Sequence, residues 1–156
     1  MLSDYNDLLS ILNAYSVRYL IVGAYAVAIH AQPRATNDLD ILVKPDPENA
    51  KALFAALSDF GAPLQSLTPH DFEAPGVFFR IGREPVSIDI FTDISGVDFD
   101  SAWQRRVEDI FDKQRNLVAN FLSRGDLLAA KRAAGRSQDI ADIEAIEKAA
   151  ENGQGE

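Results

Sequence analysis

The sequence predicts an α/β (α+β) fold in which a mixed, mostly antiparallel sheet is flanked by helices, and three patterns support this prediction. Short apolar, β-branched segments alternate with amphipathic segments of helical spacing over residues 3–60. Residues 77–91 form two β-like segments around a turn with Gly and Pro, which is typical of an antiparallel hairpin. Helical segments fill residues 123–150, and we expect these C-terminal helices to pack on the core.

The N-terminal elements are a helix, a strand and a second helix. Apolar side chains recur at helical spacing over residues 3–15, and residues 18–22 form a short apolar strand that stops at Gly23. The helix over 24–31 ends near Pro33, because proline disfavours helical geometry in the residue before it.

A strand over 38–43 comes next, followed by a helix from Pro47 to about Phe60 with Asp46 as its cap. Residues 64–76 are expected to be loop with one short helical turn. The remaining elements are hairpin strands at 77–81 and 86–91 around a turn of about four residues, a helix at 99–106, short edge strands at 107–111 and 116–119, a helix at 123–135 between Ser123 and Gly135, and a helix at 137–150 capped by Ser137.

The composition is that of an ordinary globular protein, with 156 residues, 47% of them hydrophobic and 25% charged. We expect residues 1–150 to form a single domain and residues 151–156 a frayed polar tail. The absence of cysteine excludes disulfides, thiolate metal sites and a cysteine nucleophile. The chain has no basic-then-apolar leader and no apolar run of membrane-spanning length, so we expect a cytoplasmic protein without a membrane partner.

The net charge of −9 argues against non-specific coating of nucleic acid, which depends on Lys and Arg contacts to phosphates. The charge is uneven, because residues 101–136 contain eight Lys and Arg against four Asp and Glu, a net charge of +4. This basic segment is compatible with a phosphate-bearing ligand, and equally with a solvated basic helix face.

Three aspartates are the main candidates for chemistry. Asp38 and Asp40 are separated by one residue at the start of a strand, so their side chains point to the same face. Two like charges this close repel each other, and a carboxylate pair of this kind suits a hard cation such as Mg²⁺. Asp89 lies between isoleucines in the second hairpin strand, where a carboxylate is costly unless it has a partner.

Gly23-Ala24 joins a strand to a helix, as in the turn that binds dinucleotides. The second and third glycines of that turn are missing here, which disfavours a dinucleotide-binding fold. What remains is a helix N-terminus whose exposed backbone amides favour a bound phosphate.

Together these residues resemble the signature of the nucleotidyltransferase superfamily related to DNA polymerase β. The matching parts are Gly23-Ala24, a spacer of thirteen residues, Asp38-Leu39-Asp40-Ile41 and, on a later strand, Asp89. The segments 34–40 and 131–142 resemble the small bacterial stand-alone members, including the abortive-infection toxin-type enzymes. Ala24 departs from the pattern, since the family prefers Gly or Ser there.

The resemblance implies a nucleotidyltransferase fold and the transfer of a nucleoside monophosphate from an NTP to an acceptor hydroxyl. It implies that Asp38, Asp40 and Asp89 are the catalytic carboxylates and hold two Mg²⁺ ions, which neutralise charge on the attacking and leaving oxygens. Asp89 would also act as the base toward the acceptor hydroxyl. Gly23 and Ala24 would hold the nucleotide phosphates.

Four further residues are candidates for nucleotide binding, namely Arg34, Thr36, Lys131 and Arg136. Arg34 could instead pair with a surface carboxylate. Arg136 could instead bridge to an aspartate of the last helix and help to pack it.

The acceptor is left open between tRNA, a protein side chain and a small-molecule hydroxyl. The leading biological setting is a toxin of a toxin–antitoxin or abortive-infection system, controlled by an antitoxin protein, and the basic segment is its only physical support. The alternative is a catalytically silent nucleotidyltransferase-like module that binds a nucleotide or a partner. Ala24 and the small size of the chain favour that alternative, and three acids in register disfavour it.

Overall fold

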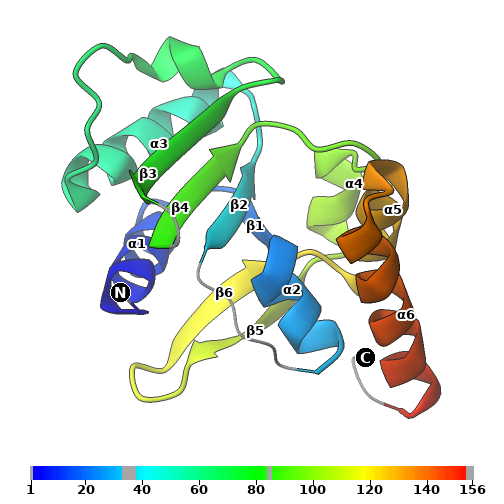
Figure 1. Cartoon of the computed structure of the whole chain (residues 1–156). Coiled ribbons are helices and arrows are strands. Elements are labelled where there is room, and N and C mark those ends of the chain that lie inside the picture. Colours follow the sequence, from blue (N-terminus) through cyan, green and yellow to red (C-terminus); the bar gives the residue numbers. More distant parts are fainter. Residues whose placement is uncertain (1, 33–37, 84–85, 154–156) are drawn as a thin grey trace.

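A computed structural model of the chain shows a six-stranded mixed sheet with helices on both faces (Figure 1). The structure describes residues 2–32, 38–83 and 86–153. The strands are β1 (Tyr19–Val22), β2 (Leu39–Val43), β3 (Phe78–Arg83), β4 (Val86–Phe91), β5 (Val107–Asp112) and β6 (Leu117–Phe121). The helices are α1 (Leu2–Ala14), α2 (Gly23–His30), α3 (Pro47–Phe60), the 3₁₀ turn η1 (Pro69–Phe72), α4 (Phe99–Gln104), α5 (Arg124–Ala134) and α6 (Ser137–Glu151). None of these helices is long and apolar enough to cross a membrane.

The strand order is β3-β4-β2-β1-β6-β5, which confirms the predicted fold class. The β1–β2, β3–β4 and β5–β6 pairs are antiparallel, whereas β1–β6 and β2–β4 are parallel. One row of register partners crosses four strands and consists of Val22, Asp40, Asp89 and Arg80. Neighbours in such a row point to the same face of the sheet, so this row fixes where the acids lie.

The two faces of the sheet bury two separate cores because strand side chains alternate. Leu39, Ile41 and Val43 of β2 contribute to the core that α1 and α3 cover. Leu42 points the other way, into the core covered by α2, α4, α5 and α6. Figure 1 shows α1 and α3 on one side of the sheet and α4, α5 and α6 on the other. Asp40 shares the second face with Leu42, so it points toward α5 and α6.

Caps explain where the flanking helices begin and end. Asp46 accepts a hydrogen bond from the Asn49 amide at the start of α3, and Gly61 ends that helix at φ 93°. Ser123 caps α5 in the same way, and Gly135 ends it at φ 65°. These four residues stand where the sequence predicted the helix boundaries.

Three predicted details are wrong. β6 is not an edge strand, because it pairs with both β1 and β5; parallel partners far away in sequence leave no local signal. Ser137 is the first residue of α6 and does not cap it, since the Asp139 carboxylate accepts the backbone N–H of Arg136 instead. The hairpin strands are longer than expected, so that only residues 84–85 separate them in sequence. These two residues lie outside the described part of the chain.

Candidate active site

A cavity of about 590 Å³ opens where β2 and β4 face α5 and α6. It brings together six of the residues predicted from the sequence, which are Gly23, Asp38, Asp40, Asp89, Lys131 and Arg136. Arg80 and Asp139 also line it, although the sequence did not single them out as site residues. The predicted nucleotide-binding residues Arg34 and Thr36 lie outside the described residues.

The three acids converge on one edge of this cavity. Asp40 and Asp89 are direct partners in the parallel β2–β4 pair, and the Ser87 hydroxyl lies 3.2 Å from Asp38 Oδ1 and 3.3 Å from Asp89 Oδ1. Burial, followed by the negative charges of Asp89 and Asp38, raises the pKa of Asp40 to about 6. The charged form of Asp40 is therefore disfavoured in this cluster, by burial first and by its two acidic neighbours second.

Arg80 contacts this cluster directly, through the carboxylate of Asp89. It donates from Nε to Asp89 Oδ1 at 2.8 Å and from a terminal nitrogen to Asp89 Oδ2 at 3.0 Å. The Asp89 side chain is only 7% exposed, whereas that of Arg80 is 37% exposed. The partner that a buried Asp89 requires is thus an arginine on the neighbouring strand.

Two features require glycine at position 23, namely its backbone conformation and the closeness of the Asp40 carboxylate. Its φ is 69°, a left-handed conformation that favours glycine, and an added Cβ would overlap the Asp40 carboxylate. The close approach places the first turn of α2, including Ala24, beside the acids. The N-cap Val22 makes no side-chain hydrogen bond, so no side chain caps the amides of this turn from that position.

The opposite wall of the cavity carries the cations of α5 and of the α5–α6 turn. Lys131 Nζ lies 3.3 Å from Asp139 and 2.9 Å from Asp142, and Arg136 Nε lies 2.7 Å from Asp139. The hydrogen bond from Arg136 is the largest cause that lowers the pKa of Asp139 to about 2. The bridge from Arg136 to α6, one of the two alternatives left open by the sequence, is therefore present.

Asp93 also lines the cavity but points its carboxylate elsewhere, because it accepts the Gly76 amide at 2.9 Å. It follows β4 and is separate from the register row that holds Asp40 and Asp89.

The donor set of the cavity fits a hard divalent cation in its chemistry, since Asp38 and Asp40 supply carboxylate oxygens whose mutual repulsion a cation would relieve. As they stand, no three His, Asp or Glu side chains among the described residues form a group that could hold one ion. Asp89 has both oxygens bonded to Arg80. Asp38 and Asp40 are therefore the residues that would hold a first Mg²⁺, and Asp89 could join only after Arg80 moves.

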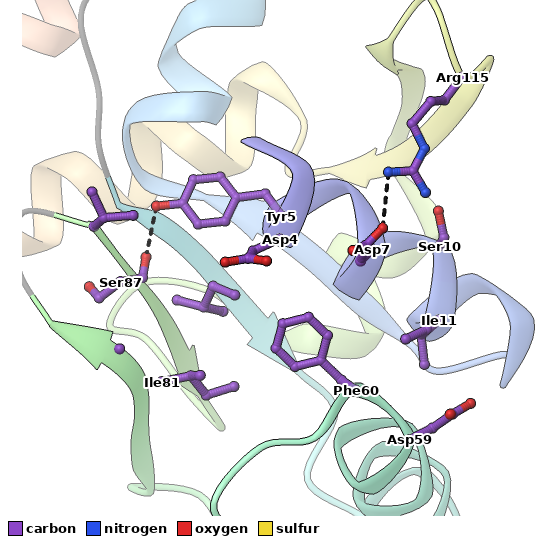
Figure 2. Close-up of a pocket in the computed structure, with 13 residues that line it drawn as sticks. Asp4, Tyr5, Asp7, Ser10, Ile11, Asp59, Phe60, Ile81, Ser87 and Arg115 are labelled. Carbon is purple, nitrogen blue, oxygen red and sulfur yellow. Dashed lines mark hydrogen bonds and ion pairs between the residues drawn. The ribbon is translucent and has the colours of Figure 1, made fainter. Parts of the chain in front are cut away.

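A second cavity of about 540 Å³ lies between α1, α3 and the β3–β4 hairpin (Figure 2). Tyr5 and Ser87 line it, and the Tyr5 hydroxyl donates to the Ser87 carbonyl oxygen at 3.2 Å. Burial raises the pKa of Tyr5 to about 12, with smaller contributions from Tyr25 and the three acids of the first cavity. The second cavity therefore adjoins the acids through Tyr5 and Ser87.

Comparison with known proteins agrees with this geometry. The model of a family described as "Nucleotidyltransferase of unknown function (DUF6036)" matches residues 2–150. No curated protein matches the chain in sequence.

Among solved structures, similar folds occur in several nucleotidyltransferases. The lincosamide antibiotic adenylyltransferase LnuA, bound to lincomycin, has a TM-score of 0.57 at 14% identity over 93% of this chain and 95% of that chain. The antibiotic-resistance factor ANT(2'')-Ia has a TM-score of 0.57 at 11% identity over 95% and 83%. An antigenic nucleotidyltransferase-like protein from Paracoccidioides brasiliensis has a TM-score of 0.51 at 21% identity over 90% and 72%. At these identities the likeness concerns the fold.

Proposed function

Because the chain belongs to this family of nucleotidyltransferases, we propose that it transfers a nucleoside monophosphate from an NTP to an acceptor hydroxyl in a Mg²⁺-dependent reaction. One observation carries the proposal. Asp38 and Asp40 from one segment and Asp89 from a distant strand converge in one cavity beside Gly23 and the first turn of α2.

Each group of this cavity has a task in the proposed reaction. The acceptor oxygen attacks the α-phosphorus, the bond to the bridging oxygen breaks, and pyrophosphate leaves. Asp89 takes the proton of the acceptor hydroxyl, and the amides at the start of α2 bind phosphate oxygens. Asp38 and Asp40 would hold Mg²⁺, which supplies positive charge for the attacking and leaving oxygens. Lys131 and Arg136 remain candidates for triphosphate contacts because they line the same cavity.

A small-molecule hydroxyl is the acceptor that we favour. The second cavity has the size of a small-ligand pocket, combines apolar walls such as Phe60 and Ile81 with aspartates, and adjoins the acids through Ser87 (Figure 2). Two of the similar folds belong to proteins named for antibiotics, one of them an adenylyltransferase.

A nucleic-acid acceptor has less support than the sequence suggested. Six of the eight cations of the basic segment form ion pairs with acidic side chains, namely Arg105, Arg106, Arg115, Lys131, Arg132 and Arg136. Paired cations attract phosphates less strongly than unpaired ones. A toxin acting on tRNA under the control of an antitoxin stays a prediction. Growth arrest on expression of the wild type, but not of Asp38→Asn, would support it.

The activity is tested by incubating the pure protein with Mg²⁺, each α-labelled NTP in turn, and either hydroxylated small molecules or a total cell extract. We expect labelled product from the wild type and none from Asp38→Asn, Asp40→Asn or Asp89→Asn. Asp93→Asn is the matched control, since it removes an acid from the same cavity but outside the register row. Full activity in Asp89→Asn, or equal loss in Asp93→Asn, would show that the third acid is wrongly assigned. A folded wild type that binds NTP without turnover would favour a silent binding module.

A further inference from the structure

Arg80 holds the third acid in a manner that conflicts with metal binding. Its guanidinium uses two nitrogens to bond both oxygens of Asp89, at 2.8 and 3.0 Å, and Asp89 is buried. A guanidinium in this position repels a divalent cation that approaches Asp89, and it occupies the lone pairs that the cation needs.

The position of Arg80 also allows it to leave. β3 is an edge strand of the sheet, and the Arg80 side chain is partly exposed, unlike that of Asp89. Its guanidinium carbon already lies 5.4 Å from the centre of the Phe78 ring, an exposed aromatic face on the same strand that can bind the cation outside the acid cluster. Arg80 also lines the cavity in which a triphosphate would lie.

We propose that Arg80 is a resident counter-ion that neutralises Asp89 and moves to the phosphates when nucleotide and metal enter together. This inference rests on the proposed function. Arg80 then opposes the binding of a divalent cation alone and supports the binding of the metal–nucleotide complex. These two effects on affinity have opposite signs. Asp89 becomes available to the metal only when the phosphates have drawn Arg80 away.

The test compares wild type with Arg80→Gln in two binding measurements. Mn²⁺ alone is followed by the electron paramagnetic resonance signal of the free ion, and Mn²⁺ with α,β-methylene-ATP by calorimetry. For Arg80→Gln we expect the Kd for Mn²⁺ alone to fall, and the Kd for the nucleotide complex to rise, each by roughly ten-fold or more. Arg83→Gln is the matched control, since it removes the same charge from the same strand at an exposed position opposite Val86.

Arg80→Met retains part of the aliphatic stem beside Phe78 and gives the same comparison if the glutamine variant is unstable. An unchanged or weakened affinity of the Arg80 variants for Mn²⁺ alone would overturn the inference. The proposed function would still stand, provided that Asp40→Asn abolishes binding of the Mn²⁺–nucleotide complex. If the wild type binds neither Mn²⁺ nor the nucleotide complex, both the inference and the proposed function fail.

Discussion

Asp40→Asn should stabilise the metal-free protein at neutral pH, because the native fold holds this carboxylate against two others. Burial and the charges of Asp89 and Asp38 raise the pKa of Asp40 from 3.8 to about 6. Between these values the folded state binds more protons than the unfolded state, so the free energy of unfolding falls as pH rises. Below pH 4 the carboxyl is neutral in both states and costs nothing.

The size of the effect follows from the shift in pKa. A difference of about two units, at 1.36 kcal/mol each, corresponds to roughly 3 kcal/mol lost by the wild type above pH 6. This is an upper value, because Asp40 is partly exposed and solvent screens its charge. For a chain of this length 3 kcal/mol corresponds to a rise in Tm of roughly 6–12 °C in the asparagine variant at pH 8.

Urea unfolding and thermal melts from pH 4 to pH 8 in the presence of a chelator measure this difference. We expect the curves of the two proteins to meet near pH 4 and to separate steadily up to pH 7. Glu144→Gln is the control, because it removes one negative charge from an exposed position on α6. Parallel profiles of wild type and Asp40→Asn over the whole range would refute the convergence of the acids. If Glu144→Gln stabilised the protein as much as Asp40→Asn does, the stabilisation would come from the change in net charge and not from the position of Asp40.

Other substitutions test the support of the site by urea unfolding. Lys131→Met leaves the two buried aspartates of α6 without their lysine, and we expect a loss of about 3–5 kcal/mol; a loss below 1 kcal/mol would contradict this. Gly23→Ala should cost at least about 1–3 kcal/mol through its left-handed φ and its overlap with Asp40, and combining it with Asp40→Gly should recover part of that loss. Ser123→Ala removes the cap of α5 and should cost about 1 kcal/mol without changing affinity for Mn²⁺.

Local rules of helix and strand formation predicted most of the fold. The caps at Asp46 and Ser123 and the terminating glycines follow from hydrogen bonds within a few residues, so the sequence contains their signal. The β1–β6 and β2–β4 pairs depend on packing of the whole sheet, which no short segment encodes. This is why the sequence alone predicts β6 as an edge strand.

The site shows the same division between local and distant information. Asp38 and Asp40 lie on one face by simple alternation, and Asp89 has a local signal because a lone acid interrupts an apolar strand. Its partner Arg80 depends on the hairpin register. A four-residue turn at 82–85 would place Phe78 opposite Asp89, whereas the longer strands place Arg80 there. A cation in the sister strand of a hairpin that contains an isolated acid is the signal that could have found it.

The row that joins Asp40 to Asp89 also has a consequence for how the protein folds. Because β2 and β4 are parallel, the whole connection between them, which contains α3 and β3, must cross over before these two strands can pair. Such distant pairs form slowly, since closing the intervening loop costs entropy before any contact compensates for it. The mutual repulsion of the carboxylates opposes the same step. The row that joins Asp40 to Asp89 is therefore expected to be among the last parts of the sheet to assemble, so that partly folded chains lack it.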